Sequence, residues 1–332
     1  MEQLKDSYGR IHDYLRISVT DRCNLRCIYC MGPEGVPHVP HKDILSYEEI
    51  LQVVKYGAEM GISKIRITGG EPLVRKDLTY LIKEIAQTPG INDLSLTTNG
   101  ILLPRLAEEL KTAGLHRVNI SLDTLEPEAY RKITRDGELK DVLEGIEAAR
   151  AHGLKPVKIN TVLMKNFNDR EVLNFLEFSR RHHVQVRFIE YMPIGEHDNE
   201  YENNYLSLEF VKKTAHEAGF KLIPIDNPKG AGPAKYFSFA NNEGTVGLIT
   251  SISGHFCDKC NRLRLTSDGR LKTCLYWQEE EQVRPVLDNP AALKSLLREI
   301  IRRKPKEHLM GEKSQPGAVE HCSMRNMSRT GG

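Results

Sequence analysis

Three closely spaced cysteines are the residues of this chain best suited to metal chemistry. Cys23, Cys27 and Cys30 follow the pattern C-x3-C-x2-C in the run CNLRCIYC, directly after a strand-like segment. A four-iron cluster normally takes four cysteine ligands, so three thiolates leave one iron with an open position for a substrate or cofactor. The spacing therefore predicts a [4Fe-4S] cluster with a reactive iron.

Two other interpretations of this triad are weaker. A structural zinc site more often shows paired C-x2-C units separated by a longer loop, and buried structural cysteines need no such tight spacing. The motif Gly69-Gly70-Glu71-Pro72 follows the second predicted strand, where a barrel places its ligand loops. Its glycines would let the polar head of a ligand approach the backbone, whereas the motif by itself is also compatible with an ordinary turn.

A second set of three cysteines lies in the carboxyl half of the chain. Cys257, Cys260 and Cys274 have the spacing C-x2-C-x13-C, and a hairpin turning at Asp268-Gly269 is predicted to return the third cysteine to the first two. This spacing allows another cluster with an open iron. It also allows a zinc ribbon with one of three fourth ligands, His255, Asp258 or Cys322.

Cationic residues next to this second triad indicate a polar or anionic ligand. In the strand-like run NRLRL, a period of two places Arg262 and Arg264 on one face and Leu263 and Leu265 on the other. Guanidinium groups form strong, directional hydrogen bonds with phosphate and carboxylate groups. The two arginines therefore favour a functional site over a purely structural one.

Further cations converge from other predicted strands. The chain has no GxxxxGK[ST] loop, so a phosphate-bearing ligand would have to be held by side chains. Arg16, Arg66 and Lys158 come from the first, second and fifth predicted strands and are expected to point toward a common lumen. Alternation places Arg66 on the same face as Lys64 and Thr68. Any one of these cations alone is more typical of a solvated surface, so the prediction rests on their convergence.

Length and composition are those of an ordinary globular protein. The 332 residues, 39% of them hydrophobic, can bury a sizeable core in one large domain and a smaller one. The formal net charge of +2 implies no bulk attraction to nucleic acid or to a membrane surface. The first residues lack the apolar core of a signal peptide and no stretch reaches about eighteen apolar residues, so we expect a cytoplasmic protein. Seven cysteines, an odd number, favour metal ligation over disulfides.

Strand-like and helix-like segments alternate along the first part of the chain. Short runs rich in β-branched residues predict strands at 14–20, 64–68, 93–98, 116–122, 157–163 and 184–192. Amphipathic segments predict helices at 46–61, 76–88, 103–113, 138–152 and 168–182, the first opened by a capping box of Ser46 and Glu49. Six such units predict an α/β fold, an incomplete (β/α)6 TIM-type barrel around a parallel sheet.

The pattern changes after about residue 220. The Pro/Gly-rich run NPKGAGPA at 227–234 is predicted as a linker, short strands separated by turn residues follow at 235–276, and a helix is predicted at 290–304. We therefore expect a barrel domain over 1–228, a smaller α+β domain carrying the second cysteine set over 229–304, and a flexible tail over 305–332.

The first triad and its surroundings resemble the radical S-adenosylmethionine (SAM) superfamily. The resemblance rests on CNLRCIYC, with an aromatic residue before the last cysteine, followed by GGEP in a βα array. It implies that the open iron chelates SAM and that one electron from the cluster releases a 5'-deoxyadenosyl radical. By the same resemblance, the SAM site includes Tyr29, Gly70, Ser121 and Met192.

Nearly the whole chain is similar to the molybdenum cofactor biosynthesis protein A family, the GTP 3',8-cyclases. The similarity runs from YLRISVTDRCNLRCIYC through IRITGGEPL, TTNG, ISLD, FIEYMPIG and CNRLRLTSDG to the terminal Gly-Gly. It implies that a second four-iron cluster binds the guanine of GTP and that the radical takes the hydrogen from ribose C3', which then bonds to C8. The product would be (8S)-3',8-cyclo-7,8-dihydroguanosine 5'-triphosphate, the first step toward molybdopterin, and the enzyme would be a lyase.

The resemblance also assigns substrate contacts and partners. The implied GTP contacts are Arg16, Arg66, Thr97, Lys158, Arg262 and Arg264, with Arg187 as a weaker candidate. The implied partners are an external one-electron reductant and, through its product, a cyclic pyranopterin monophosphate synthase, without nucleic acid or membrane. A homodimer is compatible with the sequence.

The end of the chain, RNMSRTGG, resembles the family's tail, whose paired glycines reach into the active site. Gly331 and Gly332 are accordingly assigned a catalytic role, because residues without side chains can enter a narrow channel. Thr330 stands where the family commonly has isoleucine, a departure that concerns the packing of the tail. Cys322 has no partner in the family pattern and is expected to be a free thiol.

Two other functions fit parts of the pattern. Another two-cluster radical SAM enzyme could act on a peptide or a different metabolite, but such enzymes with larger auxiliary domains usually carry more carboxyl-half cysteines than the four here. An iron-sulfur electron carrier or sensor would need neither the GGEP loop nor the inward cations. Both features therefore favour a substrate-binding enzyme.

Overall fold

The fold is built around one curved sheet of twelve strands. The structure, a computed structural model, describes residues 3–194, 201–226, 232–240, 244–310, 322, 323, 325 and 327–330. Within these residues the strands occur in the spatial order β12-β11-β10-β1-β2-β3-β4-β5-β6-β9-β8-β7. Their bounds are β1 (Tyr14–Ser18), β2 (Lys64–Thr68), β3 (Asp93–Thr98), β4 (Arg117–Ser121), β5 (Lys158–Leu163), β6 (Gln185–Glu190), β7 (Leu222–Ile225), β8 (Lys235–Phe239), β9 (Thr245–Ile249), β10 (Arg262–Leu265), β11 (Arg270–Lys272) and β12 (Glu281–Gln282).

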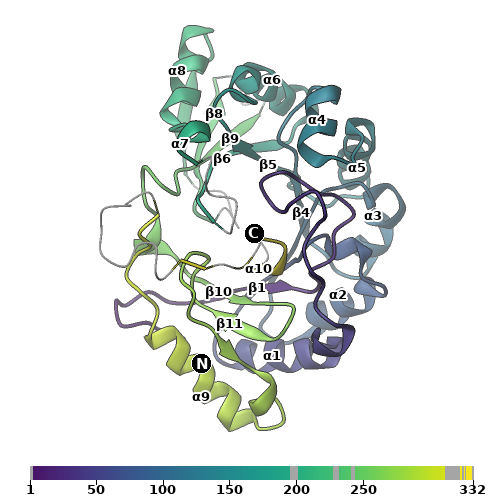
Figure 1. Ribbon diagram of the computed structural model, residues 1–332, viewed down its shortest axis with the longest axis vertical. Coiled ribbons are helices and arrows are strands. Elements are labelled where there is room, and N and C mark those ends of the chain that lie inside the picture. Colours follow the sequence, from purple (N-terminus) through teal and green to yellow (C-terminus); the bar gives the residue numbers. More distant parts are fainter. Residues whose placement is uncertain are drawn as a thin grey trace.

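The first six strands form the predicted parallel sheet, and helices cover its outer face (Figure 1). Strands β1 to β6 each pair in parallel with the next, and they fall within the six predicted segments. The helices are α1 (Tyr47–Glu59), α2 (Leu78–Gln87), α3 (Leu103–Thr112), α4 (Pro127–Thr134), α5 (Leu139–Ala151), α6 (Val172–His182), α7 (Tyr201–Asn204), α8 (Glu209–Glu217), α9 (Pro290–Arg302) and α10 (Met327–Thr330). The incomplete α/β barrel is therefore confirmed, and the sequence pattern did not predict the helices α4, α7, α8 and α10.

Local signals that predicted α1 are present in the structure. The Glu49 N–H donates to Ser46 Oγ at 3.1 Å, and the Ser46 N–H donates to Glu49 Oε2 at 2.7 Å. This reciprocal capping box satisfies two N–H groups at the start of the helix. Gly61, with φ +94°, follows the helix in the left-handed conformation that glycine adopts without strain.

The carboxyl-terminal strands extend the barrel sheet at both of its edges. Strand β10 pairs in parallel with β1, so that Arg264 lies beside Arg16, and β9 pairs in parallel with β6. Strands β10 and β11 form the predicted hairpin around Asp268-Gly269, with Gly269 at φ +82°. Because the sheet continues across residue 228, the division into domains at that position stays a prediction.

Side chains alternate across β1 between the helical layer and the lumen. Leu15 and Ile17 are fully buried in the main hydrophobic core, whereas Arg16, between them, lines an internal cavity. The same alternation along β10 buries Leu263 and Leu265 in the core and leaves Arg262 and Arg264 lining that cavity. The period-two pattern therefore separates core residues from lumen residues, as predicted.

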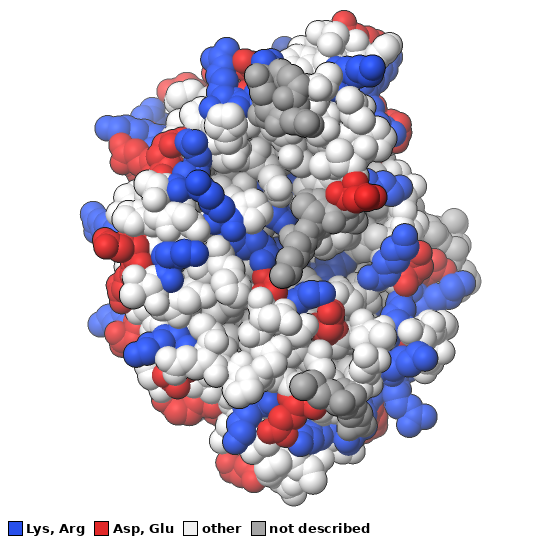
Figure 2. All heavy atoms as spheres, turned by 180° about the vertical axis from the view of Figure 1, so that it is seen from behind, with Lys and Arg blue, Asp and Glu red and all other residues white. Residues whose placement is uncertain are grey.

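The outer surface carries charges of both signs. Figure 2 shows Lys and Arg interspersed with Asp and Glu over one face of the molecule, in keeping with the net charge of +2. No helix among the described residues combines the length and the hydropathy needed to cross a membrane.

Candidate active site

The first cysteine triad lies in the long loop between β1 and α1. The Cys30 N–H donates to the Cys27 carbonyl at 2.9 Å, which closes a tight turn, and the Leu25 N–H donates to Cys23 Sγ at 3.4 Å. Burial raises the pKa of Cys23 to about 11 and that of Cys30 to about 12. Burial also raises the pKa of Cys27, where the charges of Cys30 and Cys23 add to the effect. Without a bound cation these groups are therefore held as thiols, and a metal cluster would have to displace their protons.

The spacing of the sulfur atoms bears on which metal centre fits. Among the described residues, the only group of three His, Cys, Asp or Glu with ligand atoms all within 4.8 Å of one another is His255, Cys257 and His308. The sulfur atoms of neither cysteine triad are therefore this close together. A single tetrahedral zinc, with Zn–S bonds of about 2.3 Å, would hold its sulfurs roughly 4 Å apart. Neither triad therefore has the spacing of a single zinc site in this structure.

A first cavity opens beside the first triad. All four predicted SAM residues line it, together with a residue assigned to GTP, Thr97, and with others that the sequence did not single out. The lining includes Cys23, Cys27, Tyr29, Cys30, Gly69, Gly70, Thr97, Ser121, Asp123, Asn160, Ile189, Met192 and Met327.

The GGEP loop packs directly against the cysteine loop. The Gly70 N–H donates to the Thr20 carbonyl and the Glu71 N–H to the Arg22 carbonyl, both at 2.8 Å. A Cβ atom on Gly70 would overlap the Arg22 carbonyl oxygen, so this position requires glycine for close packing as well as for ligand access. The motif thus fixes the backbone just before Cys23.

Glu71 joins the ends of two neighbouring strands. Its buried carboxylate accepts hydrogen bonds from the Leu73 N–H at 3.0 Å, the Thr98 hydroxyl at 2.8 Å and the Asn99 N–H at 2.7 Å. Burial, opposed by these hydrogen bonds, raises the pKa of Glu71 to about 7. The acidic residue of GGEP therefore holds the β2 and β3 loops together and does not line the first cavity.

Asp123 is a cavity residue that the sequence analysis missed. The Tyr29 hydroxyl donates to Asp123 Oδ2 at 2.6 Å, and the Val162 N–H donates to Oδ1 at 2.8 Å. Burial raises the pKa of Asp123 to about 6. The carboxylate holds Tyr29 in place between Cys27 and Cys30, and its position just after β4, at the carboxyl end of a barrel strand, was the signal available in the sequence.

The second triad lies at the start of β10 and after β11. Cys257 begins the 3-10 turn η5 (Cys257–Lys259) and Cys260 directly follows it, and the hairpin returns Cys274 to the same cavity. Lys304 Nζ donates to Cys260 Sγ at 3.3 Å. Although burial alone would raise the pKa of Cys260, Arg262 and Lys304 lower it to about 5. This sulfur is thus held as a thiolate, the form that binds metals.

A second cavity adjoins this triad, and six arginines are among its lining residues. The lining includes the three cysteines together with Arg16, Arg66, Arg187, Arg262 and Arg264. Arg66 and Arg187 are 8% and 3% exposed, and neither they nor Arg262 forms an ion pair with a carboxylate in the part of the chain that the structure describes. Arg187 donates instead to the neutral amides of Asn119 at 2.8 Å and Asn160 at 2.5 Å.

The arginines repel one another in this buried setting. Burial, with Arg264 as the next cause, lowers the pKa of Arg16 well below its usual value, and burial lowers the pKa of Arg187 and of Arg264 to about 10. Burial of several like charges is costly, so a polyanion that offset them would stabilise this cavity. The predicted convergence of cations is confirmed for Arg16 and Arg66.

The two cavities adjoin inside the barrel. Both are lined by Asn160, Ile189 and Met192, and along β2 the first cavity is lined by Thr68 and the second by Arg66. A ligand in the first cavity would therefore lie next to a ligand in the second. The described part of the tail reaches both, because Met327 lines the first and the Thr330 carbonyl accepts a hydrogen bond from Arg264 Nη1 at 3.3 Å. Gly331 and Gly332 lie outside the described residues.

Comparison with known proteins shows a relationship along the entire chain. Residues 17–179 match the Radical SAM superfamily, and residues 184–310 match Molybdenum Cofactor Synthesis C. The GTP 3',8-cyclases of Listeria monocytogenes and Lactiplantibacillus plantarum are each 46% identical to it over 333 residues, covering 100% of both chains. The GTP 3',8-cyclase of Petrotoga mobilis is 53% identical over 280 residues, covering 84% of this chain and 86% of that one.

The chain belongs to the GTP 3',8-cyclase family. As a member of the radical SAM superfamily it takes a [4Fe-4S] cluster and SAM, and the donor set at Cys23, Cys27 and Cys30 fits such a cluster. The fold agrees, since the crystal structure of Streptococcus suis SuiB bound to S-adenosylmethionine superimposes with a TM-score of 0.59 at 15% identity, covering 84% of this chain and 66% of that one.

Lys158, a predicted GTP contact, lies outside the linings of both cavities. It is fully buried on β5, with Nζ 5.9 Å from the centre of the Tyr236 ring. Burial, followed by the charge of Arg187, lowers its pKa from 10.5 to about 6. Between these two pH values the folded protein holds Lys158 neutral while the unfolded chain holds it charged, so its protonation costs stability and stability rises with pH. A polyanion in the lumen would raise the pKa of Lys158 again.

This shift predicts proton uptake on anion binding. At pH 8, wild-type protein should take up as much as about one proton when it binds inorganic tripolyphosphate, because Lys158 becomes charged. Lys158→Met should remove this uptake, whereas Arg131→Ala, at an exposed surface ion pair, should keep it. Isothermal titration calorimetry in buffers of different ionisation enthalpy measures the proton count. Equal uptake by wild type and Lys158→Met would contradict the assignment.

Proposed function

We propose that this protein cyclises GTP to (8S)-3',8-cyclo-7,8-dihydroguanosine 5'-triphosphate, the first step of molybdenum cofactor biosynthesis, as a SAM-dependent radical enzyme. The observation that carries the proposal is a pair of adjoining cavities, each bordered by three cysteines, of which the second is lined by buried arginines. The names of the full-length relatives support the same reaction.

The residues of the first cavity would hold SAM. A cluster bound by Cys23, Cys27 and Cys30 would supply the electron that cleaves SAM and so the radical that takes hydrogen from ribose C3'. Gly70 leaves room for the amino acid part of SAM, and Tyr29, held by Asp123, borders the adenosine end together with Ser121. Met192, in the lining shared by both cavities, would separate the cofactor from the substrate and keep water from the reacting carbon.

The residues of the second cavity would hold GTP. Arg16, Arg66 and Arg187 lie on three barrel strands, and their charges would be offset by the triphosphate. Arg262 and Arg264 adjoin the second triad, where we propose a second [4Fe-4S] cluster whose open iron binds the guanine. Thr97 lies in the first cavity and would contact GTP only where the two cavities meet.

Several finer assignments belong to the same proposal. We assign the enzyme to the lyases, with an external one-electron reductant and with transfer of the product to a cyclic pyranopterin monophosphate synthase. The proposal also includes a cytoplasmic location, a homodimer, a domain boundary near 228 and a catalytic role for Gly331 and Gly332. Each of these follows from the family resemblance or from the sequence.

An anaerobic activity assay tests the proposed reaction. The clusters are reconstituted, SAM, GTP and a strong reductant are added, and 5'-deoxyadenosine and loss of GTP are followed by chromatography. The proposal expects 5'-deoxyadenosine together with a GTP-derived cyclic product. Formation of equal 5'-deoxyadenosine without GTP, and of no GTP-derived product, would refute it.

The arginine next to Cys260 should act on substrate affinity. Arg262→Ala removes charge-assisted hydrogen bonds worth about 1.5–3 kcal/mol each, so the Kd of GTP should rise at least about tenfold. SAM cleavage should remain possible, because Arg262 does not line the first cavity. Equilibrium binding and 5'-deoxyadenosine formation measure the two effects, with the exposed Arg131→Ala as control. An equal loss of GTP affinity and of 5'-deoxyadenosine formation would indicate misfolding and not a lost substrate contact.

The metal content tests the second cluster. We expect about eight irons and eight sulfides per chain, falling to about four of each when Cys257, Cys260 and Cys274 are all replaced by alanine. Cys322→Ala serves as the matched control and should keep both clusters. Stoichiometric zinc that depends on His255, Cys257 and His308, the closely spaced group, would contradict the two-cluster proposal.

A further inference from the structure

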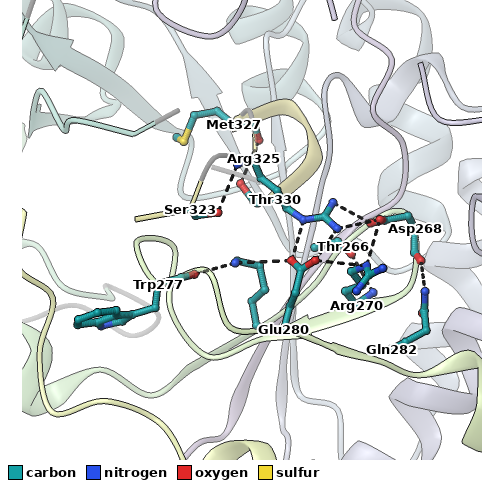
Figure 3. Close-up of polar contacts among 11 residues, drawn as sticks. Thr266, Asp268, Arg270, Trp277, Glu280, Gln282, Ser323, Arg325, Met327 and Thr330 are labelled. Carbon is teal, nitrogen blue, oxygen red and sulfur yellow. Dashed lines mark hydrogen bonds and ion pairs between the residues drawn. The ribbon is translucent and has the colours of Figure 1, made fainter. Parts of the chain in front are cut away.

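A partly buried ion-pair cluster fastens the described part of the tail to the hairpin of the second triad (Figure 3). Arg325 Nε and Nη2 donate to Glu280 Oε2 and Oε1 at 2.7 and 2.8 Å, while Nη1 and Nη2 donate to Asp268 Oδ1 and Oδ2 at 3.1 and 2.9 Å. The side chains of Arg325, Asp268 and Glu280 are 17%, 20% and 18% exposed. One guanidinium therefore bridges two carboxylates with little access for water, a strong and directional arrangement.

Both carboxylates belong to the segment that carries the second triad. Asp268 is in the β10–β11 turn, between Cys260 and Cys274, and Glu280 follows Cys274 just before β12. Neither carboxylate depends on Arg325 alone. Glu280 also pairs with Arg270 at 3.3 Å and with Lys272 at 3.7 Å, and Asp268 pairs with Arg270 at 3.6 Å. If Arg325 were lost, both carboxylates would therefore keep a cationic partner in the hairpin.

The residues that follow Arg325 in the sequence reach both cavities, and a residue that precedes it is held by the backbone. Two residues before it, the Ser323 N–H donates to the Tyr276 carbonyl at 2.6 Å. Two residues after it, α10 begins and packs against β1, with Met327 in the lining of the first cavity. Thr330, the last residue of α10, is 1% exposed and accepts from Arg264 through its carbonyl. A helix of 4 residues has little stability of its own, so contacts on either side must hold it.

We propose that Arg325 is a positioning residue that seats the end of the chain against the hairpin of the second triad. Through this anchor the Thr330 carbonyl is placed on Arg264 and Met327 on the first cavity. Arg325 touches neither cavity lining and acts through these two residues. The part of the inference that concerns GTP rests on the proposed function, whereas the anchoring itself does not.

The anchor has a direct consequence for substrate affinity. A guanidinium with a fixed carbonyl acceptor is held in one orientation, so less side-chain freedom is lost when it binds a ligand. If the end of the chain is released, Arg264 loses this acceptor, and its side chain is less restricted before the substrate binds. Release should therefore raise the KM for GTP more than it lowers kcat.

The test compares three variants of the reconstituted holoenzyme. Arg325→Ala removes the anchor, and Arg325→Lys keeps the charge but cannot bridge both carboxylates in the same way. Arg303→Ala is the matched control, because Arg303 also pairs with two carboxylates, Glu281 at 2.9 Å and Glu299 at 3.4 Å, but is exposed just after the end of α9. Hydrogen exchange measured by mass spectrometry reports the peptides that span 322–330 and 262–272, and steady-state kinetics reports the KM for GTP.

In Arg325→Ala we expect exchange in 322–330 to rise by about tenfold or more, with exchange in 262–272 unchanged, and the KM for GTP to rise by about tenfold. Arg325→Lys should recover part of both effects, and Arg303→Ala should match wild type. If 322–330 exchanges in Arg325→Ala as slowly as in wild type, the anchor is refuted. If exchange rises equally in 322–330 and 262–272, Arg325 has only a general structural role, and the anchor is refuted as well. If wild type forms no cyclised GTP while Arg325→Ala still frees 322–330 alone, the proposed function fails and the anchor stands.

Discussion

The parallel pairing of β1 with β10 is the contact on which both cavities depend. The first triad follows the carboxyl end of β1, whereas Cys257 and Cys260 precede the amino end of β10, so the paired strands separate the two triads along the barrel axis. Five residues of parallel strand rise about 16 Å. This length leaves room for two ligands placed end to end, and the register sets Arg16 beside Arg264 between them. The fold thus determines the separation of the two cysteine triads through backbone hydrogen bonds.

The same pairing concentrates positive charge in the lumen. Neighbouring strands contribute Arg16, Arg66 and Arg264 to one buried space, and the pKa values of all three guanidinium groups are lowered. Crowding of these buried like charges has an electrostatic cost, which a bound polyanion would offset. Any ligand that binds only the folded state adds to its stability, so substrate binding and barrel integrity are coupled. The anchor at Arg325 works in the same direction, since it holds an acceptor against one of the crowded arginines.

Local sequence patterns predicted the barrel well because its strands and helices follow their own periods. Arg262 and Arg264 could be assigned to the lumen from alternation alone, and the capping box located the start of α1. Long-range relations could not be read in this way. Three features depend on residues far apart in the sequence: the addition of β9 and β10 to opposite edges of the sheet, the hydrogen bond between Tyr29 and Asp123, and the full burial of Lys158 near the Tyr236 ring.

The central claim is that a radical formed in the first cavity meets the ribose of a nucleotide held in the second. GTP deuterated at C3' tests it directly, by mass spectrometry of the 5'-deoxyadenosine formed in a single anaerobic turnover. The shared lining of Asn160, Ile189 and Met192 predicts that this 5'-deoxyadenosine carries one deuterium per turnover. Unlabelled 5'-deoxyadenosine, with the deuterium retained in the nucleotide, would contradict the account.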